Sequence, residues 1–99
     1  MFSATVEGDD THRTVAVAGE VDMLTADAMY QAVTRAPAKR LTLDLRGVTF
    51  FDSAAIHGLI RLAERYPDAL EVLPSAQVLR VLDISGLAGQ PWLRVPDAG

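Results

Sequence analysis

The chain has 99 residues, of which 49% are hydrophobic and 22% are charged, a composition typical of one small globular domain. Its formal net charge is −4, and it contains one lysine and no cysteine, which argues against a nucleic-acid-binding surface and excludes disulfides and thiolate metal sites. No apolar run approaches the ~20 residues that cross a bilayer, and the amino-terminal residues lack the pattern of a signal peptide. We therefore expect residues 1–99 to form a single cytoplasmic domain with no membrane insertion and no direct nucleic-acid partner.

The first third of the chain predicts a β-hairpin followed by a helix. Apolar and polar residues alternate over 2–7 and again over 13–18, which is the period of half-buried strands joined by a short turn. From Thr25 onward, apolar residues recur at spacings of three and four. This predicts an amphipathic helix that Thr25 or Asp22 could cap and that Pro37 ends. Two apolar rows are expected to face the core: Leu24, Ala28 and Ala32, and Met29, Val33 and Ala36.

The middle of the chain predicts a third strand and a second helix. Residues 41–45 alternate between apolar and polar, and the apolar pattern continues past Gly47 to Phe51. A helix is predicted over residues 54–66, and Pro67 stops it. Its core face is expected to contain Ile56, Leu59, Ile60 and Ala63.

The last third predicts a short fourth strand over residues 70–73 and a third helix that begins at Ser75 and stops at Gly86. Residues 92–95 could form an edge strand or an ordered tail. Strands separated by helices imply right-handed crossovers and parallel pairing, whereas the opening hairpin adds an antiparallel pair. We therefore predict an α/β fold with a mixed sheet and helices packed mainly on one face. Val78, Leu79 and Leu82 of the third helix are expected to face the core.

No group of residues predicts a catalytic, metal or cofactor site. The histidines, His12 and His57, lack the spacing of metal ligands, and no glycine-rich phosphate loop of the usual kinds occurs. The 13 acidic residues are scattered and form no obvious acid–base pair within one helical turn. The sequence therefore predicts a protein that is not an enzyme and that uses no cofactor.

The segment of most interest is residues 48–56. Here Asp52 and Ser53 interrupt an apolar stretch at the point where the third strand must meet the second helix. Either side chain could cap the helix by accepting a backbone N–H from its first turn. From composition alone, a helix cap is the simpler interpretation of this polar pair.

Two further segments change that interpretation. Residues 19–22, Gly-Glu-Val-Asp, lie between the second strand and the first helix, and residues 82–87, Leu-Asp-Ile-Ser-Gly-Leu, close the third helix. Taken in this order with residues 48–56, they resemble the STAS family, and most closely its bacterial anti-sigma-factor antagonists. Those proteins typically carry Gly-Glu-Leu-Asp, then a hydrophobic residue followed by Asp-Ser-Ser/Thr-Gly-Leu-Gly, then Asp-X-Ser-Gly-Leu. The resemblance covers residues 15–87.

This resemblance implies a STAS fold and a role as an anti-sigma-factor antagonist. In that family, an anti-sigma factor serine kinase phosphorylates the serine after the motif aspartate, here Ser53 after Asp52, and a serine phosphatase resets it. A helix start would tolerate the added negative charge, while a partner surface built for a neutral hydroxyl would meet repulsion. The surface that the resemblance assigns to phosphorylation and partner binding contains Gly19, Glu20, Asp22, Asp52, Ser53, Ala54 and His57.

The sequence departs from the antagonist pattern immediately after Ser53. Ala54 stands where that pattern has Ser or Thr, and Ala55 and His57 stand where it has glycines. Glycine allows a partner backbone to approach closely, so its replacement favours a second hypothesis. In that hypothesis the chain is a STAS scaffold that is not phosphorylated, such as a subunit of a transporter or of a signalling assembly.

Overall fold

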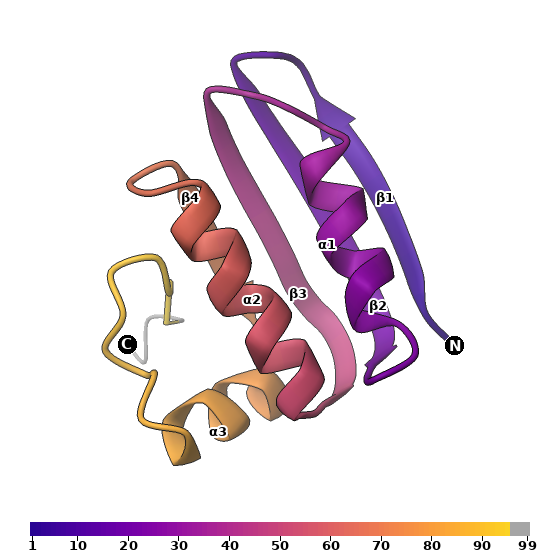
Figure 1. Cartoon of the computed structure of the whole chain (residues 1–99), viewed down its shortest axis with the longest axis vertical. Coiled ribbons are helices and arrows are strands. Elements are labelled where there is room, and N and C mark those ends of the chain that lie inside the picture. The colour runs from indigo at the N-terminus through magenta and orange to yellow at the C-terminus, as the bar shows by residue number, and fades with distance from the viewer. Residues whose placement is uncertain (96–99) are drawn as a thin grey trace.

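The computed structural model describes residues 1–95. It contains one sheet of four strands in the order β1-β2-β3-β4, together with three helices (Figure 1). This order of elements confirms the predicted α/β fold with a mixed sheet. The strands are β1 (Ser3–Gly8), β2 (His12–Val21), β3 (Arg40–Phe51) and β4 (Leu70–Pro74), and the helices are α1 (Ala26–Thr34), α2 (Ser53–Arg65) and α3 (Ala76–Ile84).

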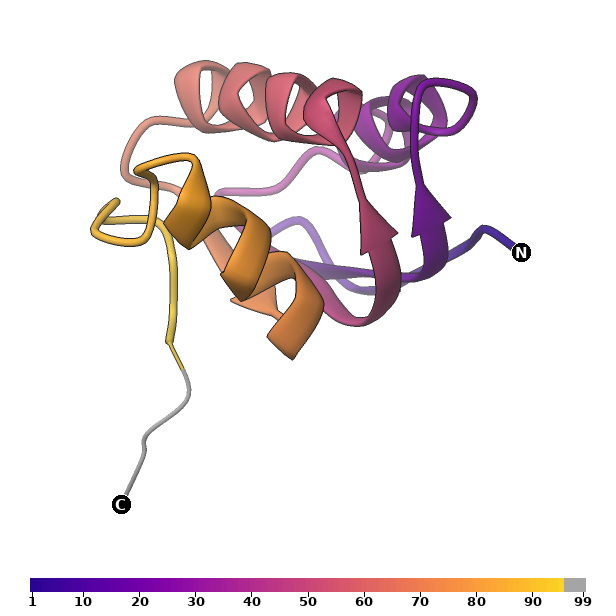
Figure 2. The same ribbon diagram turned by 90° about the horizontal axis from the view of Figure 1, so that it is seen from below.

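The pairing of the strands follows from the lengths of the connections. A short turn joins β1 to β2, which pair antiparallel, whereas α1 and α2 are crossovers that make β2–β3 and β3–β4 parallel. Figure 2 shows α1 and α2 side by side above the sheet, whereas α3 lies lower and is drawn in front of the sheet in this view. None of these helices, within the part of the chain that the structure describes, is long and apolar enough to cross a membrane.

The hydrophobic core lies between β3 and the α1–α2 pair. Leu41, Leu43 and Leu45 alternate along β3 toward these helices and are at most 1% exposed. Val15 and Val17 of β2 extend the same buried row. The core is therefore built on the central strand, as the alternation of residues 41–45 predicted.

The buried face of α2 differs from the predicted one. Ile56 and Ile60 are only partly buried, because α2 approaches α1 along its small residues instead. A Cβ placed on Gly58 would lie 3.6 Å from Met29 Cε, an ordinary van der Waals contact, so the two helices are already close at this position. The buried residues of α2 are Ala55, Gly58, Leu59 and Leu62.

The first of the two apolar rows predicted for α1 is only partly correct, because Ala32 packs against the core but Leu24 and Ala28 do not. Leu24 is 86% exposed because the helix begins only at Ala26, which leaves Leu24 in the preceding loop. Ala28 is exposed as well. The second row, Met29, Val33 and Ala36, is buried as predicted.

Helix α3 begins and ends where the sequence predicts. The hydroxyl of Ser75 accepts the backbone N–H of Val78 (3.1 Å) and donates to the carbonyl of Val48 in β3 (2.7 Å), so one side chain both caps the helix and ties it to the sheet. Gly86 follows with a φ of +79°, a conformation that glycine adopts without strain at a helix end. Of the predicted inward residues, Val78 and Leu82 are buried, whereas Leu79 is only partly so.

Replacing Leu43 by alanine tests the assignment of β3 as the centre of the core. Leu43→Ala should lower the free energy of unfolding by about 2–5 kcal/mol, because it removes fully buried methyl groups and leaves a cavity. Leu24→Ala, at an exposed site, should change it by less than about 0.5 kcal/mol. Denaturant melts of the two variants measure the difference, and equal losses would contradict this picture of the core.

An ion pair on the sheet face opposite α1 and α2 gives a pH-dependent prediction. Arg46 donates from Nε and Nη2 to the two carboxylate oxygens of Asp44, each at 2.9 Å, and these hydrogen bonds hold the pKa of Asp44 below its usual range. A lowered folded-state pKa means that the pair stabilises the fold above the ordinary carboxyl range. That contribution is lost as the pH falls through this range toward the lowered pKa.

Asp44→Asn should therefore lower the free energy of unfolding at neutral pH, by up to about 1 kcal/mol since Arg46 is largely exposed. At about pH 2 the difference between variant and wild type should shrink toward zero. Denaturant melts at the two pH values provide the measurement, and Asp10→Asn, which replaces an exposed carboxylate of the hairpin turn, is the control. A loss of the same size at both pH values would count against the pair.

Candidate functional site

The predicted site lies where β2 and β3 end. Because these strands are parallel, their carboxyl ends lie at the same end of the sheet. There the backbone N–H of Asp52 donates to the carbonyl of Val21 (3.3 Å). This bond holds the start of α2 beside the loop that connects β2 to α1 (Figure 1). The topology therefore brings together the segments 19–22 and 52–57, which the sequence singled out separately.

Asp52, and not Ser53, caps α2. Asp52 has extended backbone angles (φ −106°, ψ −170°), and its Oδ1 accepts the N–H of Ala55 at 3.0 Å. Its carbonyl accepts the N–H of Ile56, also at 3.0 Å, as the first bond of the helix. The structure thus decides between the two residues that the sequence offered as caps.

Ser53 is the first residue of α2 and is exposed. No hydrogen bond engages its hydroxyl among residues 1–95. The side chain stands at the amino end of the helix, where unpaired backbone N–H groups and the helix dipole favour negative charge. Ser53 is therefore accessible, and its hydroxyl makes no bond that stabilises the described chain. It also lies where the negative charge of an added phosphate is tolerated.

Asp22 shapes the neighbouring loop. Its Oδ1 accepts the backbone N–H of Leu24 (2.9 Å) and of Thr25 (3.2 Å). Thr25 occupies the cap position of α1 but makes no side-chain cap bond, and its hydroxyl instead donates to the carbonyl of Glu20 (2.9 Å). The conformation of the loop beside Ser53 thus depends on the aspartate of the Gly-Glu-Val-Asp segment.

Gly19 and Glu20 hold the amino terminus against the sheet. The carboxylate of Glu20 lies 2.7 and 2.9 Å from the ammonium group of Met1. Gly19 has a φ of +89°, and a Cβ there would lie 1.8 Å from the carbonyl oxygen of Met1, so no other residue fits without a shift of the chain. These two residues of the motif therefore have a structural role that the sequence did not predict.

The positions that depart from the antagonist pattern are not equivalent in the structure. Ala55 is fully buried and Ala54 is partly buried against the core, so the methyl group of Ala55 is turned away from any partner. His57 is exposed and lies four residues after Ser53, which places both side chains on one face of α2. The imidazole of His57 is therefore the departure that a docking partner would meet.

Three exposed apolar residues belong to the same two segments of the chain as these polar residues, and the sequence analysis did not assign them to the site. Met23 and Leu24 in the β2–α1 loop are 79% and 86% exposed, and Phe50 near the end of β3 is 47% exposed. Exposed apolar residues that gather beside polar groups are typical of protein–protein contact surfaces. For Leu24 a sequence signal was available only if Thr25, and not Asp22, was taken as the helix cap, because Leu24 then precedes the helix. We name the set Met23, Leu24, Phe50, Asp52, Ser53 and His57 the Ser53 surface.

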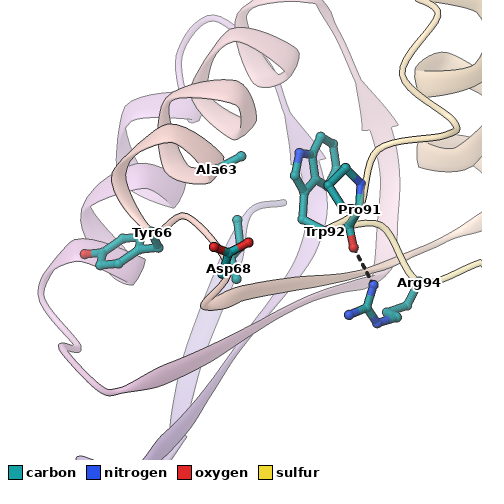
Figure 3. Close-up of a pocket in the computed structure, with 7 residues that line it drawn as sticks. Ala63, Tyr66, Asp68, Pro91, Trp92 and Arg94 are labelled. Carbon is teal, nitrogen blue, oxygen red and sulfur yellow. Dashed lines mark hydrogen bonds between the residues drawn. The ribbon is translucent and has the colours of Figure 1, made fainter.

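A hollow of about 180 Å³ lies at the opposite end of α2 (Figure 3). Asp68, which has a φ of +62°, and the aromatic side chains of Tyr66 and Trp92 line it. Pockets that enclose small ligands usually measure about 300–1,000 Å³, so this one is small for such a role. Within residues 1–95 no group of three or more acidic, histidine or cysteine side chains could hold a metal ion.

The chain is similar to known proteins in sequence and in fold. The family model described as "Mlab, STAS domain" matches residues 4–95. The crystal structure of an anti-sigma factor antagonist from Mycobacterium paratuberculosis is 28% identical, with a TM-score of 0.81 over 97% of this chain and 87% of that one. No curated protein matches the chain.

The fold is also similar to that of the anti-sigma factor antagonist SpoIIAA. Its unphosphorylated form is 17% identical, with a TM-score of 0.69 over 97% of this chain and 90% of that one. The phosphorylated form of SpoIIAA, a Bacillus cell fate determinant, is 16% identical, with a TM-score of 0.63 over 97% and 93%. At these identities the likeness shows the fold alone, which both forms share with this chain.

The assignment of the cap can be tested by two neighbouring substitutions. Asp52→Ala should lower the free energy of unfolding by about 0.5–2 kcal/mol, because it removes the acceptor for the Ala55 N–H. Ser53→Ala should change it by less than about 0.5 kcal/mol, since the exposed hydroxyl makes no bond in the described chain. Thermal or denaturant melts compare the two, and a larger loss for Ser53→Ala would reverse the assignment.

Proposed function

This chain belongs to the STAS domain family, and on that premise we propose that it is an anti-sigma-factor antagonist that binds an anti-sigma factor serine kinase and is released when Ser53 is phosphorylated. It acts as a binding protein rather than a catalyst. Its place of action is the cytoplasm, where a serine phosphatase removes the phosphate and restores binding. The similarity to the Mycobacterium paratuberculosis antagonist over 97% of this chain supports the role.

The observation that carries the proposal is the separation of two tasks between neighbouring residues. Asp52 caps α2, and Ser53, exposed and unbonded among residues 1–95, is left for modification. A kinase can therefore take the hydroxyl without opening the fold. If Ser53 were the cap, phosphorylation would exchange the capping hydroxyl for a larger, charged phosphate and would alter the start of the helix together with the surface.

Electrostatics explains how phosphorylation would release the partner. A phosphate adds about −1.5 to −2 charges at neutral pH beside the carboxylate of Asp52. Within the domain this charge is tolerated, because it lies at the amino end of a helix. At an interface that receives a neutral hydroxyl, the same charge would lose its water and meet groups placed for another charge state. The switch therefore acts on the interface and not on the fold.

The exposed apolar residues supply the attraction that such an interface needs. Met23 and Leu24 project from the loop that Asp22 shapes, and Phe50 lies at the end of β3 before Asp52. Interfaces usually surround a few buried apolar side chains with a polar rim. On this surface Asp52, Ser53 and His57 would form part of that rim.

A second candidate function keeps the same surface but leaves Ser53 unmodified. In this case the chain is a STAS subunit of a transporter or of a signalling assembly. The exposed imidazole of His57 favours it, because the antagonist pattern has glycine there, and the matching family model is described as "Mlab, STAS domain". The partner would then bind permanently, with the hydroxyl of Ser53 as an ordinary contact.

Calorimetric titration against an anti-sigma kinase from the same organism separates the two functions. Ser53→Ala should bind within a few-fold of the wild type, because the hydroxyl is a small part of the interface. Ser53→Asp should bind at least about tenfold more weakly, since it places a charge where the hydroxyl contacts the partner. Incubation with kinase and ATP should add one phosphate to the wild type, located at Ser53 by peptide mass spectrometry, and none to Ser53→Ala.

Ser3→Ala and Ser3→Asp are matched controls, because Ser3 is also an exposed serine but lies in β1, outside the Ser53 surface. Both should bind the kinase and accept phosphate like the wild type. Equal affinity of the wild type and both Ser53 variants, with no phosphate found on Ser53, would refute the switch. The unmodified STAS subunit would then be the better account.

A further inference from the structure

One edge strand of the sheet, β4, is covered by another segment of the chain, whereas the other edge strand, β1, is exposed. At the β4 edge, Val72 donates its N–H to the carbonyl of Trp92 (2.8 Å) and accepts the N–H of Arg94 (2.9 Å), so the segment after α3 covers the edge like a short fifth strand. At the other edge, every residue of β1 is exposed. Figure 1 shows β1 as the outermost strand on its side of the sheet, with α1 over one face only.

The hairpin register shows which backbone groups of β1 face outward. Hydrogen-bonded and non-hydrogen-bonded pairs alternate along an antiparallel ladder. The bond from the Asp9 N–H to the His12 carbonyl (3.1 Å) makes that pair hydrogen-bonded, and the register then assigns Thr5 with Ala16 to the same class. Ala4 and Val6 fall in the other class, so their N–H and C=O groups point away from β2 toward solvent.

This edge lacks the features that usually prevent strands from associating. Natural edge strands are protected by lysine, proline, a bulge or a covering segment. The sequence of β1, Ser-Ala-Thr-Val-Glu-Gly, contains neither lysine nor proline, and Glu7 is its one charged residue. Its pairing with β2 runs from Ser3 to Gly8 without a register shift. The edge is therefore a regular template for another strand.

We propose that β1 pairs antiparallel with β1 of a second copy of the chain, about a two-fold axis at Thr5. In this register Ala4 lies opposite Val6 of the second copy, and these are the residues whose backbone groups face outward. An axis at Thr5 pairs the chain over residues 2–8, whereas an axis at Ala4 or Val6 would leave one end of the strand unpaired. The full overlap favours the axis at Thr5.

The side chains of β1 suit a second copy in this register. Ala4 and Val6 face the helix side of the sheet, so the apolar Val6, 46% exposed in one chain, would pack on Ala4 of the second copy. On the open face, Thr5 would lie opposite Thr5 of the second copy, a favourable cross-strand pair. Glu7 would lie opposite Ser3 and not opposite another Glu7. No position therefore sets like charges against each other, and no residue of the Ser53 surface is used.

Sedimentation equilibrium of two lysine variants tests both the edge and the register. The wild type should rise in average mass from 10.7 kDa toward twice that value as its concentration approaches about 1 mM. Thr5→Lys should stay at 10.7 kDa, because it sets two lysines opposite each other at the axis. Ser3→Lys, on the same strand and face, should associate at least as strongly as the wild type, because its lysine meets Glu7 of the second copy.

Single cysteines give an independent measurement, because the natural chain has no cysteine. Across the axis, Thr5→Cys would place two cysteines in a non-hydrogen-bonded pair, with Cα atoms about 4.5 Å apart, within reach of a disulfide. Ser3→Cys would place them four residues apart along the strands, about 13 Å, which is too far. Mild oxidation should therefore cross-link Thr5→Cys at least tenfold faster than Ser3→Cys.

A wild type that stays monomeric up to about 1 mM would overturn the proposal, as would association of Thr5→Lys equal to that of the wild type. Equal cross-linking of the two cysteine variants would overturn the register. The comparison of the two cysteine variants still tests the register if a lysine variant folds poorly. Neither result bears on kinase binding, because β1 lies outside the Ser53 surface.

Discussion

The parallel pairing of β3 with β2 on one side and β4 on the other is the constraint on which the rest of the structure depends. It requires crossover helices, and Leu41, Leu43 and Leu45 of the central strand then bury themselves beneath those helices. It also brings the carboxyl ends of β2 and β3 to the same end of the sheet. There the hydrogen bond from the N–H of Asp52 to the carbonyl of Val21 joins the segments that follow these two strands. The core and the candidate site are therefore consequences of the same pairing, which is why neighbours with only 16–17% identity can retain the fold.

Much of this fold could be predicted from the sequence because its signals are local. Alternation identified β1, β2 and β3, prolines and glycines marked where helices stop, and Ser75 was found at the start of α3. The face of α2 could not be predicted in the same way. Its apolar period pointed to Ile56 and Ile60, but the face that is buried depends on contacts across the core, where Gly58 lies close to Met29 of α1. Such a contact involves residues distant in sequence, so no pattern within one helix reveals it.

In the candidate site, too, local features could be predicted from the sequence, whereas contacts between distant residues could not. Ser53 and Asp52 could be located from their position between a strand and a helix, but only geometry tells which of the two accepts the N–H of Ala55. Glu20 was expected near Ser53 as part of an acidic loop, and the topology does bring its segment beside the start of α2, but the contact of its carboxylate with the ammonium group of Met1, 19 residues away in sequence, could not be predicted. The exposure of Met23 and Phe50 was also beyond the sequence, since apolar residues in a strand or loop give no sign of whether anything covers them.

The structural roles of the motif residues determine how little of the fold the proposed phosphorylation would disturb. Gly19, Asp22 and Asp52 each satisfy a local requirement of the backbone: a positive φ against Met1, a loop held by Leu24 and Thr25, and the start of α2. With these requirements met by other residues, Ser53 carries no backbone duty through its hydroxyl within the described chain. A charge added there changes what a partner meets while the scaffold beneath it keeps every bond that positions it. A scaffold that is complete without the hydroxyl of Ser53 can serve equally in a phosphorylated antagonist and in an unmodified subunit, so the chemistry at this one oxygen, and not the fold, separates the two functions.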